Sequence, residues 1–511
     1  MIISGERRIG YPELQARIRR AATGFQTLGL RDGAPVAMML RNDFALFEVA
    51  GAAAALASPV VPINWHLKAE EVRYILIDSG ANILVCHADL LPQIRDGLPE
   101  NVRLLVVATP PEIAAAFNIA PELRHVPAGL TDWDVWRDSH AASLEPPGRS
   151  APMFYTSGTT GMPKGVRRNP MRPEQLAASE RTGTIAYGIK PNEDQVILMN
   201  GPMYHSAPNT YGMMAFRHGR TIVLEPRFDP EDMLQLIAQH RVTHMHMVPT
   251  MFVRLLRLPD DVKQRYDLSS LRFVVHGAAP CPPHIKRAMI GWWGPVVHEY
   301  FGSTETGIPV WHSAEEALKK PGTVGRAIEG GTVKIFRPDG SLCEVNEPGE
   351  IYMRQVTVPD FDYHGRPEAR AEAGRDGLIS VGDVGYLDAD GYLFLCDRKR
   401  DMVISGGVNI YPAEIENALI AMDGVRDCAV FGVPDDEFGE RLFACIEREP
   451  NAVLSAVTVQ DFLRTRLANF KVPKHIQFLD ALPREASGKI FKRKLQDLHA
   501  AGLLRAPGSP S

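Results

Sequence analysis

Over most of the first 300 residues, short apolar runs alternate with longer amphipathic runs, and this alternation constrains the fold more than any other feature. The run at 36–40 predicts a buried strand, the run at 43–57 a helix and the run at 60–63 another strand. A further helix is predicted from Asp229, which can cap the helix end, because Pro230 and two acidic residues follow it. Strand, helix and strand in this order predict an α/β fold, with helix-covered parallel sheets in a large N-terminal domain.

From about residue 321 the pattern changes to short alternating runs separated by turns. The runs at 332–336, 349–353 and 392–395 have the period of two that is typical of strands. The pairs Asp339-Gly340 and Asp390-Gly391 mark turns between such runs. We therefore expect a small antiparallel β subdomain at about 321–399, within an N-terminal domain of residues 1–399.

After a charged patch at 397–401, the pattern predicts a small α+β domain at 402–505. A helix begins at Pro412, and strands are expected near 428–433 and 442–447. Thr458, with Asp461 three residues later, predicts a capping box at the start of another helix. Residues 506–511 are rich in Pro, Gly and Ser, which predicts a disordered tail.

Composition excludes several classes of protein. Hydrophobic residues make up 45% and charged residues 23%, unlike a disordered or fibrous chain, and the formal net charge of −5 gives no general attraction for nucleic acid. None of the six cysteines forms a CxxC pair, so free thiols in a reducing compartment are expected. The N-terminus lacks the apolar core of a signal peptide, and the apolar stretch at about 49–63 is too short to span a bilayer. We therefore expect a soluble cytoplasmic protein.

The stretch at 155–166, of sequence YTSGTTGMPKGV, predicts a site for polyphosphate. Its glycines Gly158 and Gly161 allow backbone N–H groups to turn toward an anion. Hydroxyl groups and one cation add further donors, from Thr156, Ser157, Thr159, Thr160 and Lys164. The spacing differs from the GxxxxGK[ST] pattern of P-loop NTPases, because Pro163 precedes the lysine and Gly165 follows it.

On this stretch and on blocks that follow it in order, the chain resembles the adenylate-forming superfamily of acyl-CoA synthetases, adenylation domains and luciferases. The further blocks are PMYH at 202–205, GAAP at 277–280, YFGSTE at 300–305, Gly382-Asp383, DRKRD at 397–401, SGGVNIYPAEIE at 405–416 and PREASGK at 483–489. The resemblance covers nearly the whole chain and is greatest to bacterial fatty-acid or acyl-CoA ligases. It implies that the small C-terminal domain is mobile.

The resemblance implies a reaction in two steps. A carboxylate attacks the α-phosphate of ATP to give an acyl-adenylate and pyrophosphate, and the thiol of coenzyme A then displaces AMP. Lys489 is implied as the catalytic residue that bridges the carboxylate and the α-phosphate. Glu305, together with Thr156, is implied to hold Mg²⁺, because a carboxylate oxygen beside a triphosphate suits that ion.

The matching blocks also imply how the nucleotide and the acid are held. Thr304 is implied to bond the α-phosphate, Asp383 and Arg398 to bind the ribose or phosphate, and Phe301 to lie against adenine. Further nucleotide contacts are implied for Gly277, Ala278, Ala279, Tyr300 and Gly302. His205 is implied to line and gate the acyl tunnel. We expect an apolar acid pocket that draws on Met203, Tyr204, His205, Tyr211, Met214, Ala278 and Trp311.

Lys489 must reach the α-phosphate and then give way to the thiol, so the C-terminal domain is expected to rotate. The resemblance implies a hinge at 400–401, with Arg400 as the pivot, and a loop of Gly406 and Gly407 that pantetheine passes. Phe470, Lys471 and Lys474 are expected at the nucleotide end of coenzyme A. One stretch departs from the family pattern: many relatives have a Ser-His pair soon after Val166, whereas this chain continues Arg-Arg-Asn-Pro.

The favoured hypothesis is an ATP-dependent acyl-CoA ligase for a fatty or hydrophobic cyclic acid, with the acid, ATP and coenzyme A as its small-molecule partners and a homodimer as a candidate assembly. Ser206 stands where amino-acid adenylation domains usually carry Asp, which argues against an amino-acid substrate. The alternative is an acyl-AMP ligase that loads a carrier protein, although the insertion frequent in such ligases is not recognised. A luciferase-like oxygenase is a third hypothesis. A non-catalytic nucleotide-binding module is disfavoured because Lys489 and Glu305 are present.

His244 and His246 are interpreted as structural, since no further metal ligands lie near them in sequence.

Overall fold

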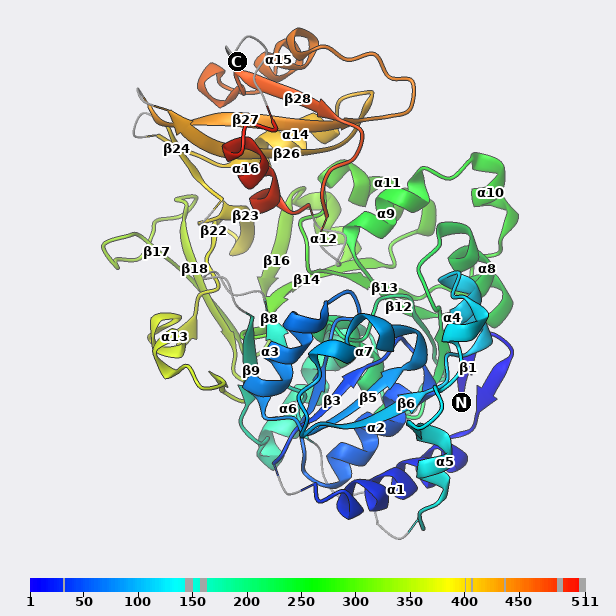
Figure 1. The fold of residues 1–511 in the computed structure, drawn as a ribbon. Coiled ribbons are helices and arrows are strands. Elements are labelled where there is room, and N and C mark those ends of the chain that lie inside the picture. The colour runs from blue at the N-terminus through cyan, green and yellow to red at the C-terminus, as the bar shows by residue number, and fades with distance from the viewer. Residues whose placement is uncertain are drawn as a thin grey trace.

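A large α/β body and a smaller α+β body make up the molecule (Figure 1), which confirms the predicted fold class. The computed structural model describes residues 1–30, 33–142, 150–156, 163–399, 401–405, 408–435, 438–484 and 490–504. The smaller body is built by residues from 403 onward and lies above the larger one in Figure 1.

A parallel sheet lies in the first part of the chain. Its strands run in the order β4 (Val60–Pro62), β3 (Val36–Met39), β5 (Ile83–His87), β6 (Arg103–Val107) and β7 (Thr131–Asp132). The helices of this part are α1 (Tyr11–Thr27), α2 (Phe44–Ala55), α3 (Ala69–Ser79), α4 (Pro111–Ala116) and α5 (Trp133–Asp138). The two strands and the helix predicted between residues 36 and 63 are confirmed.

A second, longer sheet begins with a parallel half. Its edge strand β2 (Arg7–Ile9) is antiparallel to the next strand, and the parallel strands follow in the order β1 (Ile2–Ser4), β11 (Thr221–Leu224), β10 (Val196–Met199), β12 (His244–Met247), β13 (Phe273–His276) and β14 (Val297–Ser303). Its helices are α6 (Pro173–Tyr187), α7 (Ser206–Arg217), α8 (Pro230–His240), α9 (Pro249–Leu256), α10 (Asp260–Arg265) and α11 (Pro283–Trp293). Asp229 caps α8 as predicted, because its carboxylate accepts the N–H of Glu231 at 3.0 Å.

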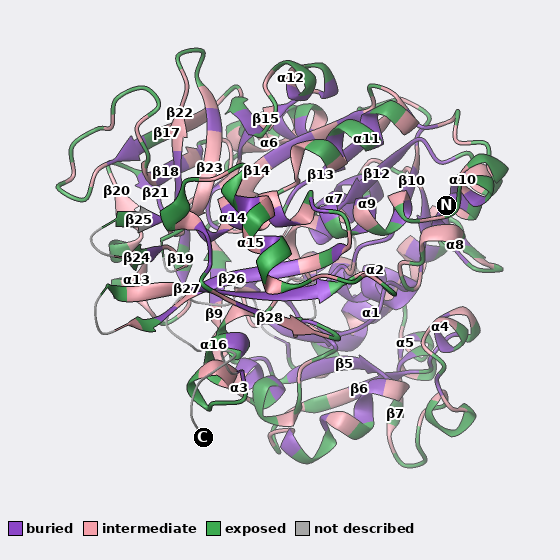
Figure 2. Ribbon diagram, turned by 90° about the horizontal axis from the view of Figure 1, so that it is seen from above, coloured by how far each residue is buried: buried purple, intermediate pink, exposed green. Residues whose placement is uncertain are grey.

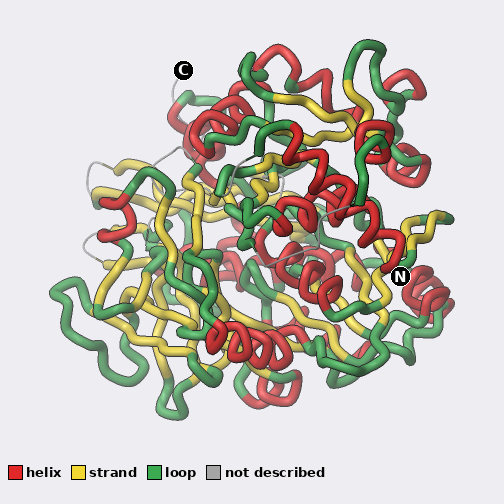
Figure 3. Tube along the Cα trace, turned by 90° about the horizontal axis from the view of Figure 1, so that it is seen from below, coloured by secondary structure: helices red, strands yellow, loops and turns green. Residues whose placement is uncertain are grey.

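The same sheet continues as an antiparallel half. After β14 its strands run in the order β15 (Gly307–His312), β16 (Thr323–Ala327), β23 (Tyr392–Arg398), β22 (Asp383–Leu387), β18 (Gly349–Gln355), β21 (Leu378–Ile379) and β20 (Gly374–Arg375), while β17 (Gly331–Phe336) pairs with β18. Helices α12 (Ala314–Lys319) and α13 (Pro367–Glu372) connect them. Seen from below, strands and long loops dominate the side of the molecule opposite the N-terminus (Figure 3). The antiparallel region expected from residue 321 is therefore present, but it is hydrogen-bonded to the parallel half through β14 and β15.

A small third sheet joins two distant parts of the chain. In it β9 (Lys164–Arg168) lies between β8 (Phe154–Thr156) and β19 (Phe361–Tyr363), antiparallel to both. The strands β8 and β9 flank the predicted phosphate loop.

The smaller body contains a sheet with helices on both sides. Its strands run in the order β25 (Val408–Ile410), β24 (Val403–Ser405), β27 (Gly439–Arg448) and β26 (Val425–Asp435), and β28 (His475–Leu479) pairs with β27. Its helices are α14 (Pro412–Ile420), α15 (Ala456–Arg464) and α16 (Lys492–Ala500). The predicted capping box at Thr458 is wrong: Ser455 is the N-cap of α15, and its hydroxyl accepts the N–H of Thr458 at 3.1 Å.

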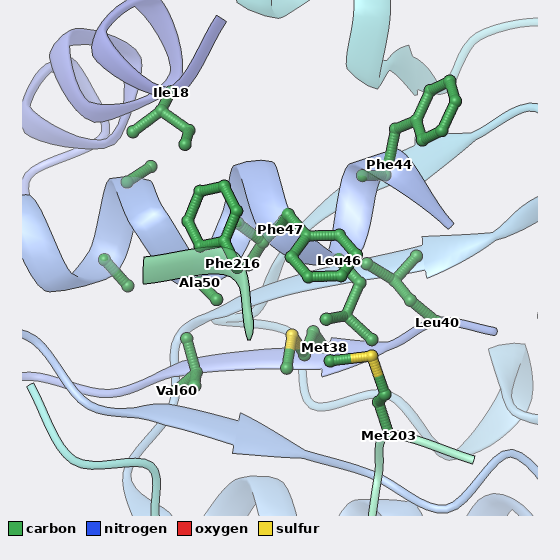
Figure 4. Packing of buried hydrophobic residues seen from close by; sticks show 14 of the residues in the cluster. Ile18, Met38, Leu40, Phe44, Leu46, Phe47, Ala50, Val60, Met203 and Phe216 are labelled. Carbon is green, nitrogen blue, oxygen red and sulfur yellow. The ribbon is translucent and has the colours of Figure 1, made fainter. Parts of the chain in front are cut away.

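The largest apolar cluster joins the two main sheets through α1, α2 and α7. Figure 4 shows Phe47 of α2 beside Phe216 of α7, with Met38 of β3 and Met203 close by. Helix α2 is apolar on nearly all sides, as expected for a helix enclosed by other elements. Figure 2 shows that buried residues concentrate in the strands, whereas the outer helices alternate buried and exposed positions.

Two predictions about the whole chain can be compared with the structure. All six cysteines are free thiols, and Cys86, Cys428 and Cys445 are buried. None of the described helices has the length and apolar character that a bilayer span requires.

Candidate active site

A tight turn between β14 and β15 presents the predicted Glu305. The chain can turn here because Gly302 lacks a side chain: a Cβ atom at that position would lie 2.0 Å from the carbonyl oxygen of Gly307. The hydroxyl of Ser303 accepts the N–H of Glu305 at 3.2 Å and the N–H of Thr306 at 3.1 Å. The turn is therefore stabilised from within, and Glu305 lines the wall of a large cavity.

The carboxylate of Glu305 accepts hydrogen bonds from two other elements. Its Oε1 atom lies 3.4 Å from the hydroxyl of Thr156 and 3.1 Å from the hydroxyl of Tyr363. The ammonium of Lys164 lies 5.1 Å from the centre of the Tyr363 ring, and Lys164 faces Thr156 across the β8–β9 pair. The structure thus brings together Thr156 and Glu305, which the resemblance paired as ligands of Mg²⁺, and pairs Lys164 with Thr156.

Two residues at this end of the cavity were not predicted, Tyr363 and Arg168. Tyr363 reaches the site because β19 pairs with β9, and no local pattern marks it. Burial raises the pKa of Tyr363 and the neighbouring Glu305 raises it further, so the phenol stays protonated and donates. Arg168 donates to the backbone carbonyls of Thr304 and Glu305. Its only signal in the sequence was the departure from the family pattern after Val166.

The residues predicted for the α-phosphate and for the acyl group adjoin each other. The hydroxyl of Thr304 lies 2.8 Å from that of Ser206, the first residue of α7. His205 is the N-cap residue of the same helix and lines the cavity. The ring centre of His205 lies 4.3 Å from that of Tyr204.

The loop after β13 and the end of β14 form another wall of the cavity. A Cβ atom at Gly277 would lie 2.8 Å from the Tyr300 ring, so glycine permits this close contact. The predicted residues Ala278, Ala279, Tyr300 and Gly302 line the cavity. Phe301 packs against the apolar cluster that contains Val310 and Leu393, so its contact with adenine stays a prediction.

The two histidines of β12 have neutral side chains. His246 bonds the hydroxyl of Tyr300 at 2.8 Å, and burial lowers the pKa of His246 to about 4. Burial likewise lowers the pKa of His244 to about 4, and His244 bonds Gln195 at 2.9 Å. Within the described ranges no group of three or more His, Cys, Asp and Glu residues is placed to hold a metal ion. These contacts agree with the structural interpretation, although His246 also lines the cavity.

Asp383 and Arg398 face each other across the β22–β23 pair. The Nε atom of Arg398 lies 3.3 Å from a carboxylate oxygen of Asp383. Gly382, whose φ is 84°, turns the chain just before Asp383, and both Gly382 and Arg398 line the cavity. The two residues predicted for the ribose or phosphate are therefore paired at the edge of the cavity.

Several predicted residues lie outside the described residues: Ser157, Gly158, Thr159, Thr160, Gly161, Arg400, Gly406, Gly407 and Lys489. The chain on either side of Lys489 is described, and Arg484 and Ile490 form an antiparallel bridge. Lys492 forms an ion pair with Glu416 at 2.8 Å. Although burial opposes it, the charges of Glu416 and Asp397 raise the pKa of Lys492. Lys492 is therefore held by an ion pair to Glu416 of its own domain and interacts with the charge of Asp397, at the end of β23 in the larger body.

The cavity has a volume of about 2020 Å³ and two chemically different ends. We call the residues Thr156, Lys164, Arg168, Thr304, Glu305 and Tyr363 the phosphate end. We call eight apolar or small lining residues of α1, α2, α6 and α7 the apolar limb, although polar residues of these helices such as Gln15, Glu180 and Asn209 also line the cavity; the eight are Ile18, Ala50, Gly51, Ala54, Tyr187, Met213, Met214 and Phe216. A ligand with a polar head and an apolar body fits such a cavity.

The predicted acid pocket is partly wrong. Tyr204, His205, Met214 and Ala278 line the cavity as expected. Met203 and Tyr211 are fully buried within the main apolar cluster. Trp311 stacks on His298 with ring centres 5.3 Å apart. These three residues lie outside the cavity lining, because they pack behind the residues that form it.

Comparison with known proteins identifies the family. Residues 1–359 match the model of the AMP-binding enzyme family, and residues 414–489 match that of the AMP-binding enzyme C-terminal domain. The chain is 35% identical to a feruloyl-CoA synthase of an Amycolatopsis species, over 95% of this chain and 93% of the relative. It is 32% identical to the long-chain-fatty-acid–CoA ligase FadD13 of Mycobacterium tuberculosis, over 97% and 94%.

Solved structures agree with these relatives. The o-succinylbenzoate coenzyme A synthetase MenE from Bacillus subtilis, in complex with ATP and magnesium ion, superimposes with a TM-score of 0.81 at 29% identity, over 97% of this chain and 96% of the other. The chain therefore belongs to the AMP-binding enzyme family, as an acyl-CoA ligase of the AMP-forming type.

Proposed function

We propose that this ligase activates a fatty or hydrophobic cyclic carboxylic acid, with its carboxylate at the phosphate end and its body in the apolar limb. The observation that carries the proposal is that one cavity joins the two ends. Its volume is larger than the 300–1,000 Å³ typical of a pocket for one small molecule, so a nucleotide and an acid fit together. The names of the relatives, an aromatic and a long-chain acid ligase, support the same class.

At the phosphate end, hard oxygen donors fit a magnesium ion. The hydroxyl of Thr156 and the carboxylate of Glu305 lie 3.4 Å apart, and this donor type is the one Mg²⁺ prefers. When bound, the ion neutralises charge on the phosphates of ATP. Lys164 adds a protein cation, with its ammonium 5.1 Å from the centre of the Tyr363 ring, and Thr304 supplies a hydroxyl for the α-phosphate.

The first half-reaction brings two anions together, so it needs a mobile cation. We assign this role to Lys489, whose amine bridges the carboxylate of the acid and the α-phosphate. The acid's oxygen then forms a bond to phosphorus while pyrophosphate leaves. The support for this assignment is the PREASGK block at 483–489, since Lys489 itself lies outside the described residues.

The remaining nucleotide contacts follow from the cavity wall. Asp383, paired with Arg398, holds the ribose hydroxyls. Adenine lies against the walls formed by Gly277, Ala278, Ala279, Tyr300 and Gly302, and Phe301 adds an apolar face. His205, which lines the cavity, gates the acyl group.

In the second half-reaction the C-terminal domain, residues 402–505, turns about Arg400 and admits the thiol. The loop of Gly406 and Gly407 then faces the cavity, and its glycines leave room for pantetheine. The arrangement in the structure includes a contact between the two domains: the guanidinium of Arg257 lies 2.8 Å from a carboxylate oxygen of Glu449 and donates to the carbonyl of Arg426 at 2.8 Å. These exposed contacts are weak enough to be exchanged during a rotation.

A panel of carboxylic acids tests the proposal. AMP release is measured for aliphatic acids of increasing length and for ring-containing acids, each with and without coenzyme A. We expect rapid AMP release that requires both a hydrophobic acid and coenzyme A. AMP release that requires a carrier protein in place of coenzyme A would support the carrier-loading alternative. Activity with small polar acids alone would contradict the assignment of the apolar limb.

Two further expectations remain predictions. A homodimer and a cytoplasmic location are proposed from the resemblance and the composition. Size-exclusion chromatography with light scattering tests the first of them.

A further inference from the structure

Arg168 lies on a strand and contacts the turn between β14 and β15, which carries Glu305. It lies on β9, two positions beyond Val166 and four beyond Lys164, and side chains so spaced point to one face of a strand. Its partner across the β9–β19 pair is Phe361, so Arg168 lies in the same small sheet as Tyr363. Arg168 is half-buried and lines the cavity.

The guanidinium of Arg168 connects two segments of backbone. One of its terminal nitrogens donates to the carbonyl oxygens of Thr304 and Glu305, the latter at 3.2 Å. The other terminal nitrogen donates to the carbonyl of Pro359 at 2.6 Å. A planar group with several donors suits this arrangement, whereas the single ammonium of lysine does not. The turn that carries Glu305 is thus attached from outside to the strand that follows the phosphate loop.

These contacts leave the carboxylate of Glu305 available. Arg168 binds the backbone of Glu305 on one side, while Thr156 and Tyr363 bind its side chain on the other. Burial lowers the pKa of Arg168 to about 10, opposed by the charges of Glu305 and Asp360, so the group remains charged at neutral pH.

We propose that Arg168 is a positioning residue that fixes the backbone of Thr304 and Glu305, so that the Glu305 carboxylate is already oriented for the magnesium ion that arrives with ATP. The inference rests on the proposed role of Glu305. It adds that Arg168, in the stretch where this chain departs from the family pattern, couples the phosphate-loop strand to the metal ligand.

A purely structural brace would stabilise the turn without affecting metal-dependent binding, so the test measures binding. Calorimetry gives the affinity of the intact protein for α,β-methylene-ATP in the presence of Mg²⁺ and in the presence of EDTA. The ratio of the two affinities reports how well Glu305 meets the ion. Circular dichroism and the melting temperature report the fold separately.

For Arg168→Met we expect the ratio to fall about tenfold, since hydrogen bonds that involve a charged group are worth roughly 1.5–3 kcal/mol. The affinity in EDTA should change little. Arg168→Lys keeps the positive charge but loses the several N–H donors of the guanidinium, so the affinity ratio of this variant should also fall. If the Arg168→Met variant does not fold, the Arg168→Lys variant provides the test. The matched control is Arg167→Met, an exposed position on the opposite face of β9, which should keep the ratio of the unmodified protein.

A folded Arg168 variant that retains the full Mg²⁺ effect would overturn the proposal, and so would a lower melting temperature with an unchanged ratio. Failure of the proposed function would look different. In that case the unmodified protein would show a magnesium effect on nucleotide binding, yet it would form no acyl-adenylate from any acid of the panel.

Discussion

The two ends of the cavity are built on opposite principles. At the phosphate end, hydrogen bonds connect distant parts of the chain: Thr156 and Tyr363 donate to the carboxylate of Glu305, and Arg168 donates to the backbone of Glu305. The apolar limb consists of small residues, methionines and aromatic rings. Directional bonds suit a nucleotide that is the same in every turnover, whereas flexible apolar packing suits an acid whose shape differs between relatives. Substitutions should therefore affect all substrates at one end and only some at the other.

The largest effect is expected for Lys489→Ala, which removes the cation that serves the phosphate end. Acid-dependent pyrophosphate release should fall about 10²–10³-fold, as when an electrostatic contact to the reacting oxygens is lost. Thioester formation from supplied acyl-adenylate should persist. Lys494→Ala, on an exposed face of α16, is the control and should leave both rates unchanged. An equal loss in both half-reactions would remove the role given to Lys489.

Glu305→Gln should lower the rate of adenylation about 10²-fold and raise the Mg²⁺ concentration needed for half-maximal rate, because a neutral amide is a poorer ligand for a hard cation. The loss should be the same for every acid tested. Adenylation rates across a magnesium titration measure this effect, with the exposed Glu368→Gln as the control. An unchanged magnesium requirement would show that Glu305 does not serve the metal.

Ala54→Phe should separate the two ends of the cavity. A ring at this half-buried position of α2 fills part of the apolar limb, so kcat/KM for the longest acids should fall about tenfold, comparable to the effect of one or two methylenes in a tight pocket. The shortest active acid serves as the internal control and should be unaffected. Equal losses for short and long acids would place the acid elsewhere.

The smallest effect is expected for Tyr363→Phe. This change removes the 3.1 Å hydrogen bond to Glu305 and keeps the ring beside Lys164, so kcat/KM for ATP should fall by roughly two- to tenfold. The fall should not depend on which acid is used. Tyr386→Phe, on a ring stacked against Phe394 in the antiparallel half, is the matched control. If the fall in kcat/KM varied with the length of the acid, the phosphate end and the apolar limb would not act independently.

Local patterns were sufficient for most elements of the fold. Alternation of apolar residues located β3, α2 and β4, and Asp229 with Pro230 located the start of α8. They failed where two residues of the same type compete, since Ser455 caps α15 and places Thr458 inside it. They also could not show that the antiparallel strands extend the parallel sheet, because that depends on which edges pair in space.

The candidate site was only partly predictable for the same reason. Motifs identified Thr156, Lys164 and Glu305, and the resemblance supplied their common purpose. Tyr363 was missed because it enters the site through a strand pairing with β9, almost 200 residues away in sequence. Met203 and Tyr211 were misplaced because apolar character does not distinguish the surface of a cavity from the layer behind it.

The pairing of β14 with β15, of β15 with β16 and of β16 with β23 has a mechanical consequence. Backbone hydrogen bonds connect the strands in turn from β14, which precedes the turn at Glu305, to β23, which ends at Arg398. The strand that leads into the C-terminal domain is therefore part of the same sheet as the strands that carry the phosphate end. Any swing of that domain must then be absorbed by the few backbone torsions that follow β23. Under the proposed rotation, a short pivot on this hydrogen-bonded base would return Lys489 to the same position relative to the α-phosphate in every turnover.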